Sequence, residues 1–202
     1  GRLLLNEQSS LVFDLGDNYV IGGAQNDRVV VTGDLRLGGR LTVRQSTGGN
    51  FGLGVYNLFT YGGTLLAGSN GVDVQTLPGA FTGLVQTLVP GQVNLVVTRP
   101  GTFVQYWDGG DATGNGAVNG GTGTWSATGT NWTGLPDSQL NTTWFNNSVA
   151  VFAGAAGTVT LDTLFSPQGL QFVTNGYTLT GGTIDNQSTG VGTGMFVSTD
   201  AA

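Results

Sequence analysis

The stretch Leu35-Arg36-Leu37-Gly38-Gly39-Arg40-Leu41 alternates apolar and polar residues, breaks at two glycines and then resumes the alternation. A period of two predicts strands with one buried face, and paired glycines allow a tight corner between them. The same pattern occurs in Tyr61-Gly62-Gly63-Thr64-Leu65 and in Leu179-Thr180-Gly181-Gly182-Thr183-Ile184. A strand, a glycine corner and another strand are typical of a β-solenoid coil, whose core forms only when coils stack.

Short strand-like runs continue along the whole chain, and no window shows a sustained period of 3.6. We therefore predict an all-β protein built from coils of about 20–25 residues. A β-sandwich is the alternative, but it would show regularly spaced hairpin turns, and Asn70-Gly71 and Asn175-Gly176 are irregularly placed. The predicted strands lie at 11–13, 28–32, 35–37, 41–43, 55–61, 93–98, 103–107, 149–152, 158–161, 171–173 and 177–179.

The composition excludes several classes of function. The 202 residues include no Cys, His or Lys, so catalysis through His or Cys and thiolate metal sites are excluded. The net charge of −6 argues against nucleic-acid binding, which needs a basic face. Only 9% of residues are charged, yet no apolar stretch approaches the ~20 residues of a membrane-spanning helix, so no membrane insertion by this segment is expected.

The second half of the chain carries a series of short Trp-, Gly- and Thr-rich motifs in a fixed order. They are Trp107-Asp108-Gly109-Gly110, Gly123-Thr124-Trp125-Ser126, Asn131-Trp132-Thr133, Val149-Ala150-Val151-Phe152-Ala153-Gly154 and Gly176-Tyr177-Thr178-Leu179-Thr180-Gly181-Gly182. In this order they resemble the passenger repeats of bacterial autotransporters, known as autotransporter-associated β-strand repeats. The first half looks like the connecting part of the same architecture, so the likeness spans nearly the whole chain.

That resemblance implies a right-handed parallel β-helix (a β-solenoid) with single-stranded, pectin-lyase-like architecture. It would form one continuous segment over residues 1–202, with a repeat register of 1–99 and 100–202. The family implies a cell-surface or extracellular location on a Gram-negative bacterium, tethered to the outer membrane by a β-barrel outside this chain. Both ends of the sequence look cut from a longer pattern.

The same resemblance implies a non-catalytic stalk or adhesin segment that needs no cofactor. Its partners would be host or bacterial surface molecules, either protein or glycan, or further copies of itself. Two alternatives stay open: a polysaccharide-degrading β-helix enzyme of the pectin lyase or hydrolase type, and a purely structural spacer.

Asp108 and Asp111 are the close acidic pair beside an aromatic residue, Trp107. Paired carboxylates can act in glycoside hydrolysis, but an Asp-Gly-Gly-Asp stretch favours a turn. Asp108, Asp111 and Asn115 are also weak candidates for a calcium site, with Thr113 as a further oxygen donor. Ca²⁺ binds six to eight oxygens and often lies in Asp-rich loops. No closing bidentate Glu follows, as an EF-hand would require.

All four tryptophans, Trp107, Trp125, Trp132 and Trp144, fall within one stretch. An exposed cluster could stack on sugar rings or form a protein-binding hot spot. The favoured interpretation is that they fill the core of wide coils, and they remain weak candidates for binding.

Two further patterns are interpreted as surface features. Arg36, Arg40 and Arg44 interleave with Leu and Val, which predicts an outward polar face; an anionic-ligand patch is the alternative. The N-glycosylation triplet Asn-x-Ser/Thr occurs at Asn131, Asn141, Asn146 and Asn186. In a bacterial surface protein we interpret these triplets as Asn- and Thr-rich turns.

Overall fold

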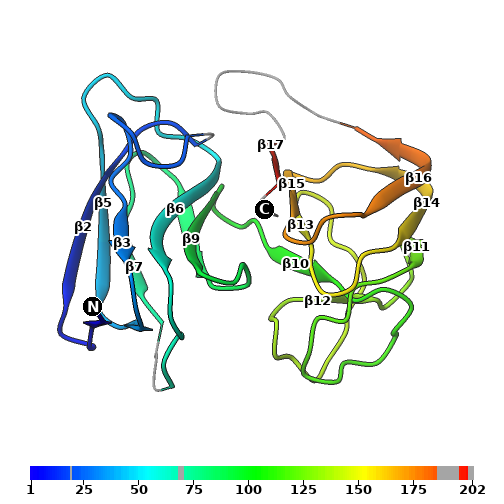
Figure 1. Cartoon of the computed structure of the whole chain (residues 1–202). Coiled ribbons are helices and arrows are strands. Elements are labelled where there is room, and N and C mark those ends of the chain that lie inside the picture. The colour runs from blue at the N-terminus through cyan, green and yellow to red at the C-terminus, as the bar shows by residue number, and fades with distance from the viewer. Residues whose placement is uncertain (19, 68–70, 186–195, 200–202) are drawn as a thin grey trace. The chain divides into compact units, whose positions relative to one another are not determined.

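The chain divides into two units, Gly1–Pro100 and Gly101–Ala202, called here the first and second unit. The computed structural model describes residues 1–18, 20–67, 71–185 and 196–199. Within these ranges all regular secondary structure is β-strand and no helix is present, which confirms the all-β prediction (Figure 1). It follows that these residues hold no helix long and apolar enough to cross a membrane.

The first unit contains nine strands among the described residues, and most of them are short. They are β1 (Leu3–Leu4), β2 (Ser10–Leu15), β3 (Val29–Val31), β4 (Leu35–Arg36), β5 (Arg40–Gln45), β6 (Gly54–Tyr61), β7 (Asp73–Thr76), β8 (Thr82–Gln86) and β9 (Gln92–Thr98).

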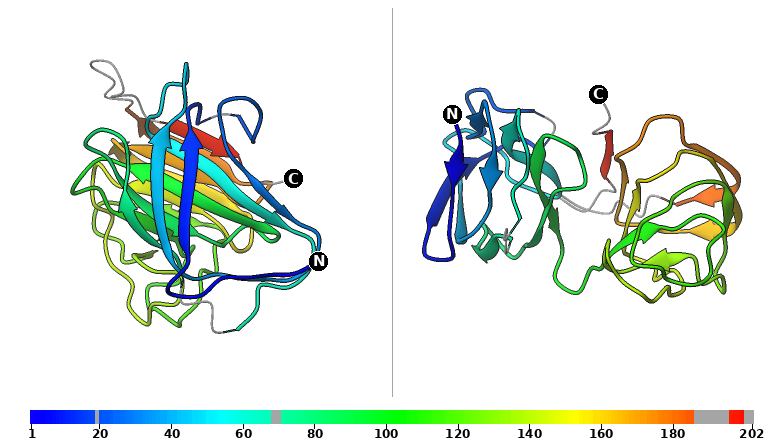
Figure 2. Two further views of the ribbon diagram at one scale, coloured as in Figure 1. Left: turned by 90° about the vertical axis from the view of Figure 1, so that its left-hand side faces the viewer. Right: turned by 60° about the horizontal axis from the view of Figure 1, so that its bottom comes forward.

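In the first unit each early strand pairs in parallel with the third strand after it: β1 with β4, β2 with β5, and β3 with β6. Figure 2 shows β2 and β5 side by side in blue and light blue. Ser10 pairs with Arg40 and Val29 pairs with Phe59, so the paired residues are equally far apart in sequence in both cases. This sequence separation is the advance of the chain from one layer to the next. That advance is longer than the coil of about 20–25 residues expected for a solenoid, so the expected coil length is too short for this unit.

Antiparallel strands complete one sheet of the first unit. β9 lies between β6 and β8 and runs antiparallel to both. The sheets are thus mixed, and a single-stranded parallel β-helix is not established by the pairing alone. A continuous β-helix over residues 1–202 likewise stays a prediction.

The second unit holds two sheets built from the remaining strands. Their bounds are β10 (Val104–Trp107), β11 (Gly123–Trp125), β12 (Trp132–Thr133), β13 (Val149–Phe152), β14 (Thr158–Phe165), β15 (Gly169–Phe172), β16 (Thr178–Ile184) and β17 (Phe196–Thr199). One sheet has the order β12-β10-β13-β15-β17 and the other the order β11-β14-β16.

All pairs in these two sheets are parallel except β10 with β12. From β13 to β15 the pairing advances from Val149 to Gly169, but from β10 to β13 it advances more than twice as far, from Val104 to Val149. The larger advance reflects a long excursion between β10 and β13. Two short strands lie within this excursion: β11 pairs in parallel with β14, and β12 pairs antiparallel with β10.

Two of the three glycine-pair motifs form corners as predicted. β4 ends at Arg36 and β5 begins at Arg40, with Gly39 at a φ of 106°. β6 ends at Tyr61, and beyond the glycine pair Leu65 bridges to Leu35 in parallel. The left-handed region that Gly39 occupies is strongly unfavourable for a residue with a Cβ.

The third motif does not form a corner, so that expectation is wrong. β16 runs without interruption from Thr178 to Ile184. Its register with β14 shifts between Leu161 and Leu164, and Gly181 has a φ of 81°. A glycine in this conformation beside a register shift is typical of a β-bulge, so the motif bends one strand and does not join two.

Each unit has its own apolar core, formed by the inward residues of its strands. In the first unit β5 shows the predicted alternation, with Leu41 and Val43 buried and Arg40 and Arg44 exposed. That core is Phe13, Leu15, Val31, Leu35, Leu37, Leu41, Val43, Tyr56, Leu58, Phe59, Val93, Leu95 and Val97. The core of the second unit is Trp107, Trp125, Trp132, Trp144, Ala150, Phe152, Val159, Leu161, Phe165 and Leu170.

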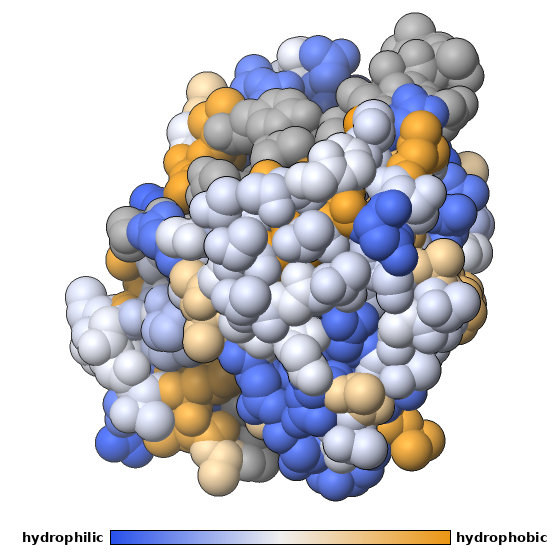
Figure 3. All heavy atoms as spheres, turned by 90° about the vertical axis from the view of Figure 1, so that its right-hand side faces the viewer, coloured by the Kyte–Doolittle hydropathy of each residue, from blue (hydrophilic) through white to orange (hydrophobic). Residues whose placement is uncertain are grey.

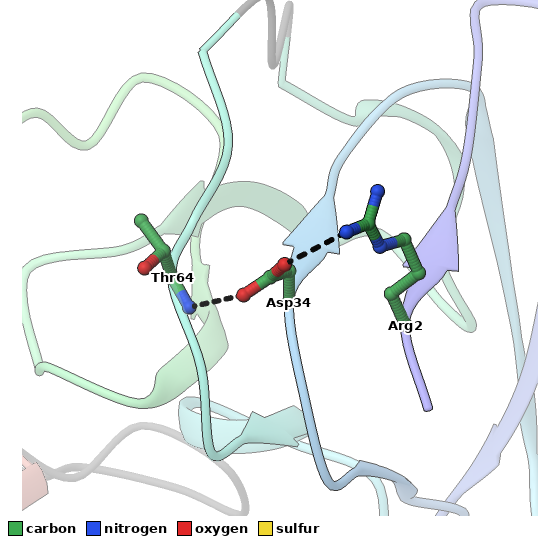
Figure 4. Close-up of polar contacts among 3 residues, drawn as sticks. All are labelled: Arg2, Asp34 and Thr64. Carbon is green, nitrogen blue, oxygen red and sulfur yellow. Dashed lines mark hydrogen bonds and ion pairs between the residues drawn. The ribbon is translucent and has the colours of Figure 1, made fainter.

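Polar contacts tie successive layers of the first unit together at one corner. Asp34 Oδ2 lies 3.6 Å from a guanidinium nitrogen of Arg2, and Asp34 Oδ1 accepts a hydrogen bond from the Thr64 backbone N–H at 3.1 Å (Figure 4). The side chains of Arg2 and Asp34 are partly exposed, so the ion pair contributes little stability. The bond to Thr64 fixes the corner before β4.

Candidate functional site

The candidate site is the excursion of the second unit between β10 and β13, residues 108–148, which is called here the lateral loop and includes the short strands β11 and β12. Asp108 follows β10 directly and is 1% exposed. Its Oδ1 accepts the Asn119 backbone N–H at 2.7 Å, and its Oδ2 accepts the Asn141 side-chain amide at 2.8 Å. One buried carboxylate therefore joins three parts of the lateral loop.

Asparagine side chains complete this network. Asn131 donates from Nδ2 to the carbonyl oxygens of Gly109 and Thr124, at 2.8 and 3.0 Å. Asn141 donates to Asp108 and also to the Asp111 carbonyl oxygen at 3.0 Å. These contacts satisfy backbone groups that a loop leaves without strand partners, so they hold the lateral loop in one conformation.

The calcium candidates lie close together, but their oxygens already have partners. Asp111 Oδ1 accepts the N–H and the hydroxyl of Thr113 at 3.0 and 3.1 Å. Asp111 Oδ2 lies 3.3 Å from the Asn115 side-chain amide, and Asn115 Oδ1 accepts the Ala117 N–H. This geometry is a turn held by its own N–H groups, and a calcium role for Asp108, Asp111 and Asn115 stays a prediction.

Asp108 lies inside the fold and is not placed to reach a substrate. Both oxygens of Asp108 accept hydrogen bonds from the chain, and Asp108 is shut off from solvent. A general acid or base must reach the substrate within hydrogen-bond distance. In the part of the chain that the structure describes, no three Asp or Glu residues gather as a metal-binding cluster would require.

Tyr177 adds a titratable group next to this network. Its hydroxyl donates to the Ala153 carbonyl oxygen at 2.6 Å and accepts the Gly121 N–H at 3.2 Å. Burial raises the pKa of the Tyr177 phenol to about 12; the Gly121 hydrogen bond opposes this shift, and the nearby Asp108 charge adds to it. Tyr177 is therefore a neutral hydrogen-bond donor at physiological pH.

The four tryptophans are core residues, as the favoured interpretation predicts. Trp107, Trp125 and Trp132 are fully buried and Trp144 is 6% exposed. Trp125 packs against Trp132 and Trp144 with ring centroids 4.8 and 4.7 Å apart, and stacks on Phe165 at 4.8 Å. Rings enclosed in this way present no face to a ligand in this structure, and a binding role for them stays a prediction without support from exposure.

Two of the three arginines, Arg40 and Arg44, lie on the outward polar face that the sequence predicts. Arg40 pairs across the sheet with Asp73, and Arg44 pairs with Asp14. Opposite charges at directly opposed positions stabilise a sheet surface. Arg36 is partly buried and donates to the Leu5 carbonyl oxygen at 3.3 Å.

A feature that the sequence reasoning missed is a threonine-covered face on the β11-β14-β16 sheet. Thr124, Thr160 and Thr180 lie opposite one another on adjacent strands, as do Thr158 and Thr178, and all five are exposed. Figure 3 shows this side as mainly pale residues of intermediate hydropathy. The recurrence of Thr-x-Thr, beginning at Thr158 and again at Thr178, was the available signal.

Apolar side chains are also exposed at the lateral loop. Leu135 is 59% exposed and Leu140 77% exposed. Thr133 and Ser138 hold the intervening turn through hydrogen bonds to the carbonyl oxygens of Leu135 and Leu140, at 2.8 and 3.0 Å. The lateral loop thus presents two large apolar residues on a fixed support.

Comparison with known proteins relates the chain to the passenger sequences of bacterial autotransporters, as its motifs predict. It is 40% identical over 186 residues to the adhesin BmaC autotransporter of Brucella suis biovar 1 (strain 1330). The match covers 90% of this chain and 5% of that relative, so the chain spans about one twentieth of the relative's length. No family model matches the chain, and no solved structure does.

Proposed function

We propose that this chain is a non-catalytic passenger segment of an autotransporter, which acts as a stalk or adhesin at the surface of a Gram-negative bacterium. The observation that carries this proposal is the 40% identity, over 90% of the chain, to an autotransporter named as an adhesin. Another part of the polypeptide would hold the segment at the outer membrane.

We further infer that the paired strands are coils of a right-handed parallel β-helix. This is supported by the first unit, where three consecutive strands pair in parallel with the three that follow, in the same order. It is also supported by the second unit, where β13, β15 and β17 pair in parallel in sequence order. Folding coil by coil would bury apolar area outside the cell and so favour export.

The adhesive surface that we propose is the lateral loop. Leu135 and Leu140 are exposed apolar residues on a turn whose conformation is fixed. Ordered apolar side chains are suited to contact because little conformational entropy is lost when they bind. The partner would be a protein or glycan on a host cell or on a neighbouring bacterium.

A deletion tests the adhesive role. Bacteria that display the polypeptide without residues 1–202 are expected to keep surface display, measured with an antibody to another part, but to lose attachment to host cells or to each other. Unchanged attachment would favour the structural spacer.

Point variants then locate the surface. Leu135→Asp with Leu140→Asp is expected to reduce attachment, because both introduce charge into an apolar contact. Leu164→Asp is the matched control, since Leu164 is 53% exposed on β14, outside the lateral loop. Equal loss in both variants would contradict a role for the lateral loop.

A further inference from the structure

The Asn-x-Ser/Thr triplets look equivalent in the sequence, but their asparagine side chains differ in burial and in hydrogen bonding in the structure. Asn131 is 8% exposed, and its Nδ2 donates to two carbonyl oxygens. Asn141 Nδ2 donates to the Asp108 carboxylate and the Asp111 carbonyl. A sugar on either nitrogen would replace one of these hydrogens and require space already filled by the lateral loop. The Asn186 triplet lies outside the described residues.

Asn146 differs from both. It is exposed and lies in a tight turn, in which the Ser148 N–H donates to the Phe145 carbonyl oxygen at 3.2 Å and Asn147 has a φ of 64°. Gln105 fixes this turn, because its Oε1 accepts the Phe145 N–H at 2.8 Å and its Nε2 donates to the Thr143 carbonyl oxygen at 2.9 Å.

The orientation of the Asn146 amide is set by a tryptophan. The Trp144 indole N–H donates to Asn146 Oδ1 at 3.1 Å. Because an indole nitrogen is only a donor, the atom facing it must be the amide oxygen. The nitrogen is the other branch of the amide, and within the described residues no hydrogen bond from it is seen. A substituent on Nδ2 would leave the contact with Trp144 unchanged.

Two features near Asn146 have no explanation in the fold. The Ser148 hydroxyl is buried without a hydrogen-bond partner, although an unpaired buried hydroxyl costs free energy. Phe103 and Phe145 are 63% and 47% exposed, with ring centroids 5.8 Å apart. A hydroxyl at position 148 is part of the N-glycosylation triplet, and exposed aromatic rings can pack against the apolar face of a sugar.

We propose that Asn146 is an N-glycosylation site whose first sugar lies against Phe103 and Phe145. Nδ2 would attack the anomeric carbon of a phosphate-activated sugar. A C–N bond forms, the C–O bond to phosphate breaks with its electron pair leaving on the phosphate, and Nδ2 loses one proton. Ser148 is 1% exposed in the folded chain, so a transferase that reads the triplet must act before this segment folds. A sugar added to Asn131 or Asn141 at that stage would block the contacts of the lateral loop, so of the chains modified at one of these three sites only the one modified at Asn146 can reach this fold.

Mass spectrometry of the protein purified from the bacterium that makes it tests the site. No Lys or Arg follows Arg99, so a protease that cleaves before Asp replaces trypsin. It releases residues 137–161, which contain Asn141 and Asn146 but not Asn131. We expect one or more sugar masses on this peptide, assigned to Asn146 by fragmentation. An unmodified Asn146 in that protein would overturn the proposal.

Variants made in the same bacterium distinguish the loss of the glycosylation triplet from an effect on folding. Asn146→Gln and Ser148→Ala are expected to abolish the added mass, whereas Ser148→Thr and Asn141→Gln keep it. Ser148→Ala should also leave the melting temperature of the deglycosylated protein unchanged or higher, because the lost hydroxyl has no partner. Added mass that persists in Ser148→Ala, or that maps to Asn141, would overturn the assignment.

Discussion

At the scale of single residues, the lateral loop depends on one buried charge. Asp108 accepts hydrogen bonds from Asn119 and Asn141, which are distant from it in sequence. Both donors are neutral, so the carboxylate is stabilised by hydrogen bonds without a cation beside it. Removing the carboxylate would therefore take an acceptor from two donors, one of which, Asn141, is partly buried.

Asp108→Ala is expected to lower the free energy of unfolding by about 3 kcal/mol, because two charge-assisted hydrogen bonds are lost. Urea denaturation followed by tryptophan fluorescence measures the change. Asp137→Ala, at an exposed position of the same loop, should change stability by less than ~0.5 kcal/mol. A similar loss in both variants would show that the network does not depend on Asp108.

The raised pKa of Tyr177 leads us to expect that stability falls at alkaline pH. The folded pKa of about 12 lies above the ordinary value of 10.0, so the folded state binds this proton more tightly than the unfolded state. The contribution to stability is complete below pH 10 and is lost as the pH rises from 10 towards 12. Thermal melts across this range should show a decline that Tyr177→Phe reduces. An identical decline in the variant would contradict the assignment.

At the scale of elements, the strands that the sequence predicted share a period of two with apolar residues on one face. β5 and β2 are examples, found at Arg40–Gln45 and Ser10–Leu15. The missed strands lack that signal: β7 is Asp73–Thr76 and β11 is Gly123–Trp125, with few apolar residues. They are strands because a neighbouring strand pairs with them, and pairing over long sequence distance is not encoded locally.

From the corner between β4 and β5 we predict that two glycines differ in how much their substitution lowers the stability. Gly39→Ala should destabilise the first unit by about 2 kcal/mol, because φ is 106° and the new Cβ would contact the Ser9 carbonyl oxygen. Gly52→Ala is the control, because nothing lies within 4 Å of its Cβ position. Chemical denaturation compares the two. A neutral Gly39→Ala would contradict the corner geometry.

At the scale of the whole molecule, the described strands leave sheet edges open. β2 and β3 are the first strands of their sheets, with Val12 47% and Val30 63% exposed. Open edges with apolar residues favour association with other strands. In the isolated chain, copies are therefore expected to associate through these edges, and this can be tested.

Val12→Lys combined with Val30→Lys is expected to shift the isolated chain towards its monomer mass of 20.7 kDa, because charges on edge strands oppose pairing. Sedimentation velocity over a range of concentrations measures the shift. Leu164→Lys, on a strand paired on both sides, should have no such effect. Association that is unchanged in the double variant would exclude these edges.

In the candidate site, the residue types could be predicted from the sequence but their burial could not. The sequence could name Asp108, the four tryptophans and the Asn-x-Ser/Thr triplets, because residue types and short spacings are visible in it. It could not tell that Asn131 is buried while Asn146 is exposed. That difference follows from hydrogen bonds to Gly109 and Thr124, which the fold brings to Asn131.

The sequence by itself determined the all-β class, the positions of the alternating strands, two glycine corners and the relationship to autotransporters, since these depend on residue type and period. Only the tertiary structure decided which strands pair and how far each pairing advances, the burial of all four tryptophans and the threonine face. The physical reason is that alternation fixes which side chains share a face, whereas stacking between distant segments decides which face is covered.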